Sequence, residues 1–187
     1  MSFPVNCIVS MTEDGGIGKD GKLPWPQLKT DMSFFRRLTT NCPIEGKQNV
    51  VIMGRKTWFS IPPQYRPLRD RINIVVSQTM DHPPSGAHFL ASSVKEALEL
   101  VNSPCLSRAV ALVWIIGGSG IYKEAMLTPG PMRLFVTRVL HRFECDTYFP
   151  VENMSQFKLL PEHPYSQTPG VKDNGISLQF EVYEKIN

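Results

Sequence analysis

Residues 113–126 read Val-Trp-Ile-Ile-Gly-Gly-Ser-Gly-Ile-Tyr-Lys-Glu-Ala-Met, an apolar run that stops at two glycines and resumes with helical spacing. The run predicts a buried strand, Gly117 and Gly118 predict a turn without side chains, and a helix is expected from Ser119. The first N–H groups of a helix have no partner within it, and the helix dipole places positive charge beside them. The segment therefore predicts either a plain strand-turn-helix joint or a site for a phosphate or pyrophosphate.

On both sides of this segment, short runs rich in Val and Ile alternate with helical or turn-forming stretches, which predicts parallel strands joined by crossover helices. The predicted strands are 5–10, 49–53, 72–77 and 112–116, and the predicted helices are 28–39, a short piece from Lys56, 94–101 and 119–126. After 132–139, a stretch containing Pro and Gly (160–175) precedes 176–182, whose strict alternation predicts an antiparallel strand at the end of the sheet. With 187 residues and no repeat or linker, we expect one α/β domain over 1–187.

Composition and charge exclude several classes of protein. A net charge of +3, with arginines interrupted by Asp70, does not indicate a nucleic-acid partner. No window approaches the roughly 18 apolar residues of a membrane span, and the first residues do not resemble a secretory signal, so we expect a cytoplasmic protein. The spacing of cysteines and histidines indicates free thiols and no metal site; these residues are Cys7, Cys42, Cys105, Cys145, His82, His88, His141 and His163.

A glycine-rich loop follows the first predicted strand. Gly16-Ile-Gly-Lys-Asp-Gly21 matches the dinucleotide fingerprint, but that fingerprint opens a helix, and Leu23-Pro-Trp-Pro26 forbids one. The loop instead predicts a mobile flap whose apolar groups, Ile17, Leu23 and Trp25, can close over a ligand. A serine nucleophile elbow is excluded, because Ile121 stands where the motif around Ser119 requires glycine.

Asp31 interrupts the apolar face of the helix predicted at 28–39. Positions 28, 31, 32, 35 and 38 share that face, and the other four are Leu, Met, Phe and Leu. Two interpretations are open: an acid favoured in the first turn of a helix, or a desolvated carboxylate that holds a polar ligand. A buried carboxylate is unfavourable without a partner, so the second interpretation requires a cationic or amidine-like pair of donors.

Six segments in order resemble the dihydrofolate reductase family, in its vertebrate type. They are Leu23-Pro-Trp25, the acid on the next helix, Met53-Gly-Arg-Lys-Thr-Trp58, Ser60-Ile-Pro62, Arg71-Ile-Asn73, and Ile116-Gly-Gly118 with Tyr122. The resemblance covers nearly the whole chain. It implies a mainly parallel sheet of eight strands with flanking helices and an antiparallel C-terminal strand.

The resemblance implies NADPH-dependent reduction of 7,8-dihydrofolate to tetrahydrofolate, by a monomer that binds antifolate inhibitors. Asp31 would bind the 2-amino group and N3 of the pterin, and the Thr137 hydroxyl would bridge to the same site. Hydride would pass from nicotinamide C4 to pterin C6, while water admitted near the flap would protonate N5. Arg71 would hold the α-carboxylate of the glutamate tail, and the Gly117–Gly118 peptide would be cis.

The matching positions give the expected site. The catalytic positions are Leu23, Trp25, Asp31, Tyr122 and Thr137. The positions expected around the substrate are Ile8, Val9, Asp31, Met32, Phe35, Arg36, Ser60, Ile61, Tyr65, Leu68, Arg71, Ile116 and Thr137. The positions expected around the cofactor are Ser10, Gly16, Ile17, Gly18, Lys19, Asp20, Gly21, Lys22, Arg55, Lys56, Thr57, Ser77, Gln78, Thr79, Ser92, Gly117, Gly118, Ser119, Gly120, Ile121, Tyr122, Lys123 and Glu124.

Three features depart from the vertebrate pattern. Asp31 replaces a glutamate and has a shorter reach. Gln78 and Ser92 replace arginines at the adenosine 2′-phosphate, so we expect a weaker preference for NADPH and contacts from the remaining Lys56, Arg55 and Ser77. Tyr65 replaces an asparagine near the substrate tail.

Two other functions stay open: a related reductase of another pterin or of a riboflavin precursor, and a noncatalytic module that binds nucleotides or RNA. Turnover of dihydrofolate separates the first of these from dihydrofolate reduction. The continuous set of motifs from Leu23 to Thr137 argues against the second.

Overall fold

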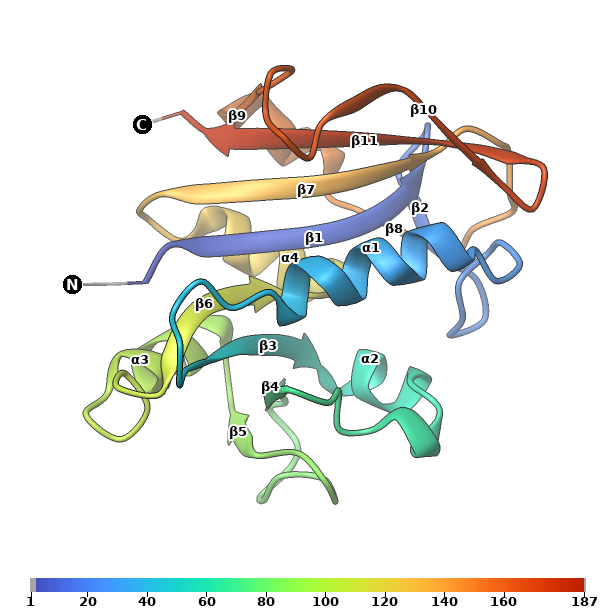
Figure 1. The fold of residues 1–187 in the computed structure, drawn as a ribbon. Coiled ribbons are helices and arrows are strands. Elements are labelled where there is room, and N and C mark those ends of the chain that lie inside the picture. The colour runs from blue at the N-terminus through green and yellow to red at the C-terminus, as the bar shows by residue number, and fades with distance from the viewer. Residues whose placement is uncertain (1–2, 187) are drawn as a thin grey trace.

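A computed structural model describes residues 3–186, and its centre is one mainly parallel sheet (Figure 1). Across the sheet the strands run β10 (Gln167–Asp173), β11 (Ile176–Lys185), β7 (Met132–Val139), β1 (Val5–Thr12), β6 (Val110–Ile115), β3 (Gln48–Gly54), β4 (Arg71–Val76) and β5 (Phe89–Ala91). These are the eight strands that the family resemblance implies. β9 (Phe157–Leu159) pairs with the last residues of β11, and β2 (Gly16–Gly18) forms a separate two-stranded ribbon with β8 (Thr147–Tyr148).

The four strands predicted as parallel are all present, as β1, β3, β4 and β6. Parallel pairing joins β1 to β6 and β7, β3 to β4 and β6, and β4 to β5. β11 is antiparallel, as predicted, but it does not lie at the end of the sheet, because β10 forms within 160–175 and pairs with it. The register shifts between Gln167 and Val171, and a Cβ on Gly170 would overlap the carbonyl oxygen of Leu178. Gly170 therefore allows an irregular edge strand to form within 160–175, where the sequence shows no alternation of apolar and polar residues.

Helices cover both faces of the sheet. α1 (Lys29–Thr40) crosses one face, whereas α3 (Val94–Asn102) and α4 (Ser119–Leu127) lie behind the sheet in the view of Figure 1. α2 (Arg55–Ser60) follows β3 directly, and two short 3-10 helices, η1 (Pro63–Tyr65) and η2 (Val151–Gln156), complete the helical elements of the described residues. Each predicted helix is present close to its predicted bounds.

Two apolar cores lie on opposite faces of the sheet, because successive side chains of a strand point to opposite sides. Cys7 and Met11 of β1 belong to the core that includes residues of α3 and α4. Ile8 belongs to the second core, with Leu28 and Leu38 beside and within α1. The alternation along β1 thereby decides which of its residues can meet α1.

Residues 3–186 include no helix with the length and apolarity that crossing a bilayer requires. Within the same range, no three His, Cys, Asp or Glu side chains gather as a metal ion would need. All four cysteines are free thiols, as predicted.

Candidate active site

The predicted site lies where the parallel strands end. Ile116 follows β6, and its N–H donates to Ile52 O of β3 at 3.0 Å. Gly54 ends β3, and its N–H donates to Gly117 O at 2.8 Å. These bonds hold the loops after β3 and β6 together at one edge of the sheet. In open α/β sheets, that edge is where ligands bind.

Asp31 packs against this edge from α1. The Ser10 hydroxyl donates to its Oδ1 at 2.9 Å and to its Oδ2 at 2.7 Å. Thr137, which pairs with Ser10 across β1 and β7, hydrogen-bonds the same carboxylate. Asp31 is only 8% exposed, and burial raises the pKa of its carboxyl; the two hydroxyls act in the opposite direction, and the charge of Asp173 adds to the rise. The acid lies in the first turn of α1, as the first interpretation has it, and it is also desolvated; that it holds a polar ligand stays a prediction.

Several apolar side chains on the same face of the sheet as this acid are not fully buried. Met32, one residue beyond it on α1, is 49% exposed. Phe35, Ile61, Leu68 and Ile116 are partly buried and pack against the core beneath α1. Exposed apolar surface beside a buried carboxylate is typical of a binding pocket for a ring with a polar edge.

Val9 differs from the other expected substrate positions. Its side chain belongs to the core that includes α3 and α4, so it points away from the face on which Ile8 and Asp31 lie. Because adjacent strand residues point to opposite faces, the Val9 side chain does not share that face, and the expected contact of Val9 with the substrate stays a prediction. Its main chain stays beside the site.

Trp25 supplies an unused polar group near the flap. Its ring is 5% exposed and meets Phe143 edge to face, with centroids 6.2 Å apart. The indole Nε1 is buried and has no hydrogen-bond partner among the described residues. Because buried donors are normally satisfied, this N–H is available to a ligand or to water. Leu23, two residues earlier, is 58% exposed.

Arg71 is a buried guanidinium at the start of β4. Its Nε donates to Arg69 O at 2.8 Å and its Nη1 to Thr39 Oγ1 at 2.9 Å. Burial and, to a smaller extent, the charge of Arg36 on α1 together lower the pKa of Arg71 to about 10, although the charge of Asp70 acts in the opposite direction. The described hydrogen bonds leave the Nη2 donors of Arg71 unused, which suits two-point binding of a carboxylate.

Two further expected substrate positions, Ser60 and Tyr65, lie at the end of α2 and in η1. The Ser60 hydroxyl donates to Thr57 O at 2.7 Å, at the end of α2. Tyr65, in η1, is 62% exposed. The exposure of Tyr65 leaves its ring free to contact a flexible substrate tail at the surface.

The loop between β6 and α4 brings peptide N–H groups to the strand edge. The Gly117–Gly118 peptide is cis, as the family resemblance implies, and Gly117 has φ +110. A Cβ on Gly117 would lie 3.0 Å from the Tyr122 ring, so glycine is required there for space as well as for conformation. The Tyr122 hydroxyl donates to Ile8 O at 2.7 Å and ties α4 to β1.

These residues fit the pyrophosphate of a dinucleotide such as NADPH. The N-cap of α4 is Gly118, and no side chain caps the helix. A Cβ on Gly120 would meet nothing within 4 Å, so the space outside this helix terminus is open. Arg55 and Lys56 are exposed at the start of α2, next to Thr57, and neither forms an ion pair within residues 3–186. Open N–H groups with nearby cations bind phosphates.

The residues expected around the adenosine end of the cofactor provide hydroxyl groups, and an acidic side chain that the sequence did not predict lies beside them. Ser77 Oγ and Thr79 Oγ1 lie 3.3 Å apart, beside the exposed Gln78. Ser92 donates through its N–H and its hydroxyl to the carboxylate of Glu96. Sequence reasoning did not place Glu96 at this end of the site. A carboxylate in that place disfavours a phosphate, so it adds to the loss of the two arginines.

The far end of the expected pyrophosphate segment has a structural role as well. Glu124 Oε1 accepts a hydrogen bond from Val94 N at 2.8 Å and thereby caps α3. This contact explains the residue without a cofactor, and a direct Glu124 contact to NADPH stays an untested prediction. Ser119 donates to Tyr148 O at 2.6 Å, and Lys123 is exposed.

The flap over residues 16–22 is anchored by a distant part of the chain. The Asp146 carboxylate accepts from Asp20 N at 2.8 Å, and Asp146 N donates to Gly18 O at 2.9 Å. Lys19 Nζ lies 3.0 Å from a carboxylate oxygen of Glu144. Sequence reasoning missed these acids, because β2 and β8 are too short to show a period. The rest of the expected flap, Gly21 and Lys22, forms the exposed turn of this ribbon.

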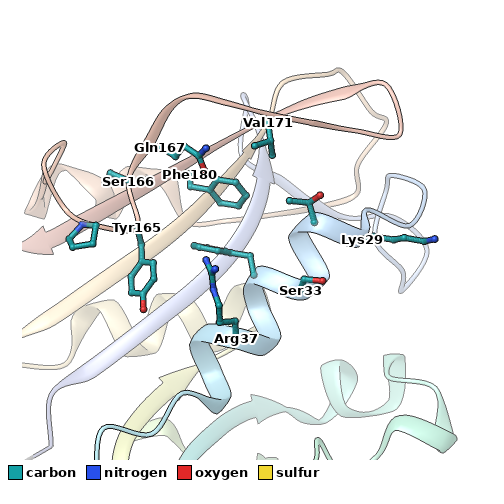
Figure 2. A pocket seen from close by; sticks show the side chains of 11 residues that line it. Lys29, Ser33, Arg37, Tyr165, Ser166, Gln167, Val171 and Phe180 are labelled. Atoms are coloured by element: carbon teal, nitrogen blue, oxygen red, sulfur yellow. The ribbon is translucent and has the colours of Figure 1, made fainter.

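A cavity of about 550 Å³ lies on a different face of α1 (Figure 2). Phe34, Tyr165 and Phe180 line it, and the Arg37 guanidinium lies 5.7 Å from the ring centroid of Phe34 and 5.8 Å from that of Tyr165. None of the expected site residues lines this cavity. It is therefore separate from the site around Asp31.

Comparisons with known proteins agree with this geometry. The family model described as dihydrofolate reductase matches residues 4–185. Dihydrofolate reductase of Bos taurus is 55% identical over 187 residues, which is 100% of both chains. The viral dihydrofolate reductase of Saimiriine herpesvirus 2 is 50% identical and covers 100% of this chain and 87% of its own. The solved structure of Schistosoma mansoni dihydrofolate reductase superposes with a TM-score of 0.85 at 40% identity, with 100% of both chains covered. The predicted resemblance is confirmed: the chain belongs to the dihydrofolate reductase family.

Proposed function

We propose that this chain reduces 7,8-dihydrofolate to tetrahydrofolate through a site centred on Asp31 and Arg71. Reduction of dihydrofolate with NADPH is the function of the family to which the chain belongs. The observation that carries the assignment of residues is the buried Asp31 carboxylate, held by Ser10 and Thr137 beside the exposed Met32. This arrangement supports a planar ligand with two adjacent donors on its polar edge.

Asp31 orients the substrate. As an anion it accepts hydrogen bonds from the 2-amino group and N3 of the pterin, which is the pair of donors that its burial requires. When bound, NADPH supplies a hydride for pterin C6. Trp25 and the flap keep bulk water from that carbon while admitting the water that protonates N5. Asp31 therefore contributes mainly by orientation and polarisation, and it does not protonate N5 directly.

Arg71 holds the α-carboxylate of the glutamate tail. The free Nη2 donors and the nearby Arg36 charge support this role, since two cations in one place favour an anionic group. Lys56, Arg55 and Ser77 hold the adenosine 2′-phosphate, where Gln78 provides no charge.

We further propose that residues 1–187 act as a single domain and as a cytoplasmic monomer. Antifolate inhibitors are expected to bind the same site, where paired N–H donors complement the Asp31 carboxylate.

The decisive experiment is the loss of NADPH absorbance on adding dihydrofolate to the purified protein, with Asp31→Asn as the inactive comparison. Turnover by the wild-type protein that collapses in the variant supports the proposal. No turnover of dihydrofolate, together with turnover of another pterin or of a riboflavin precursor, would refute it in favour of a related reductase.

A further inference from the structure

The Ser10 hydroxyl makes hydrogen bonds only to the Asp31 carboxylate in the described part of the chain. Its oxygen lies 2.9 Å from Oδ1 and 2.7 Å from Oδ2, so one proton is shared between both carboxylate oxygens. Such a bond to an ionised acceptor is about twice as strong as a bond between neutral groups. It also fixes the plane of the carboxylate, because rotation about the side chain would lengthen one of the two contacts.

We propose that Ser10 is a positioning residue for the reduction, whose hydroxyl binds both carboxylate oxygens of Asp31 and holds them in place for the pterin. The proposal deepens the function proposed above and rests on it. It gives Ser10 a role toward the substrate, beyond the contact on the nicotinamide side that the family resemblance implies.

The acceptor capacity of the carboxylate agrees with this role. An ionised aspartate has about four lone-pair positions and no donor. The Ser10 proton is shared between both oxygens and Thr137 brings a second proton, and the remaining acceptor capacity serves the 2-amino group and N3 of the pterin. A set of four donors around one short side chain gives Asp31 a defined orientation without the longer reach of glutamate.

The charged groups around Asp31 make these hydroxyls necessary. Asp173 of β10 faces α1, where its Oδ2 accepts from Thr30 N at 2.5 Å, and its negative charge raises the pKa of Asp31. Tyr122 of α4 is a buried neutral phenol, and burial followed by the charges of Cys7 and Asp31 raises its pKa well above the usual value. No cation among the described residues contributes to the pKa of Asp31. The anion is therefore maintained by hydroxyl donors, of which Ser10 has the larger effect on that pKa.

The direct test is a titration of the Asp31 carboxyl by carbon NMR in the substrate-free protein. In Ser10→Ala we expect the midpoint to rise by roughly one pH unit, the shift that corresponds to losing one charge-assisted hydrogen bond. Ser10→Thr keeps a hydroxyl and should restore most of the shift. Ser103→Ala is the matched control, since it removes a hydroxyl at the end of α3 whose one hydrogen bond among residues 3–186 is to Leu100 O.

Kinetics test the link to the reaction. At neutral pH, Ser10→Ala should lower kcat/KM for dihydrofolate roughly 10-fold, yet it should have no further effect when Asp31 is already asparagine. An unchanged midpoint in Ser10→Ala, or an equal loss in both backgrounds, overturns the proposal. A wild-type protein that does not turn over dihydrofolate refutes the proposed function alone, and the titration still decides whether Ser10 holds the carboxylate.

Discussion

Replacing Asp31 by asparagine is expected to impair turnover and to stabilise the fold. Asparagine has one acceptor oxygen and one donor amide, whereas the pterin presents two donors. One of the two hydrogen bonds from the pterin is lost, and the other is then made to a neutral oxygen instead of a charged one. Each charge-assisted bond contributes about 1.5 to 3 kcal/mol, so the combined loss is about 3 kcal/mol or more, which corresponds to roughly 10²-fold in turnover at neutral pH. Low pH, or a substrate that is already protonated, should restore part of the rate.

The effect on stability follows from the pKa of the same carboxyl. Burial raises that pKa in the folded protein above the ordinary value of 3.8, so the folded chain binds the proton more tightly than the unfolded chain. The resulting stabilisation is complete below the unfolded pKa and disappears as the pH rises through the folded pKa. At neutral pH the ionised Asp31 therefore lowers the free energy of unfolding, and a neutral amide of the same shape does not.

Urea denaturation at several pH values, beside the absorbance assay, measures both effects. Asp31→Asn should unfold at a higher urea concentration than wild type at neutral pH, and the difference should shrink as the pH falls. Asp81→Asn, which changes an exposed acid, should move neither property. Near-normal turnover in Asp31→Asn would refute the assigned role, and a lower urea midpoint at neutral pH would refute the argument from desolvation.

Three further substitutions test other parts of the site. Arg71→Leu should raise KM for dihydrofolate roughly 10-fold or more while sparing a pterin without the glutamate tail, since a charge-assisted bond of about 1.5 to 3 kcal/mol is lost. In the wild-type protein, binding of the glutamate tail should weaken as the pH rises through the Arg71 pKa of about 10. An equal rise in KM for both pterins in Arg71→Leu, or a similar rise in the control Arg69→Leu, which changes an exposed arginine, would mean that Arg71 supports only the fold. Lys56→Gln should narrow the preference for NADPH over NADH, mainly through weaker NADPH binding in paired titrations with both cofactors; an unchanged ratio contradicts the assignment. Asp146→Ala removes the acceptor of Asp20 N, so faster amide hydrogen exchange at Asp20 and a lower kcat are expected, and unchanged exchange would show that the flap is held by other contacts.

The sequence predicted the centre of the sheet because its strands are buried on both faces. Runs such as those of β3 and β4 are apolar almost throughout, and no helix period competes with them. The edge strand β10 was missed because its register shifts at Gly170 and no alternation survives. β2 and β8 were missed because such short strands depend on their partner more than on their own residues.

At the site too, features that depend on neighbouring residues could be predicted, and features that depend on distant parts of the chain could not. Asp31 could be found because an acid in an apolar stripe is visible in one helix, and the glycines before α4 because turns require them locally. The contact of Ser10 with Asp31 depends on how α1 crosses β1, which no local pattern encodes. The carboxylates of Glu96 and Glu124 act on groups in or beside α3, and only the folded chain brings Glu124 there.

The sheet divides the protein into two compartments that can change separately. The proposed pterin side is built on the core beneath α1, and the proposed pyrophosphate side on the core that includes α4, so a layer of backbone separates packing changes in one core from the ligand expected on the other side. Ile8 links the two compartments, because its side chain lies in the core beneath α1 while its carbonyl oxygen accepts from the Tyr122 hydroxyl in the core that includes α4. Substitutions in the core beneath α1 can therefore accumulate, for instance under selection by an inhibitor, and change the shape of the proposed pterin side while the core that includes α4 keeps its packing.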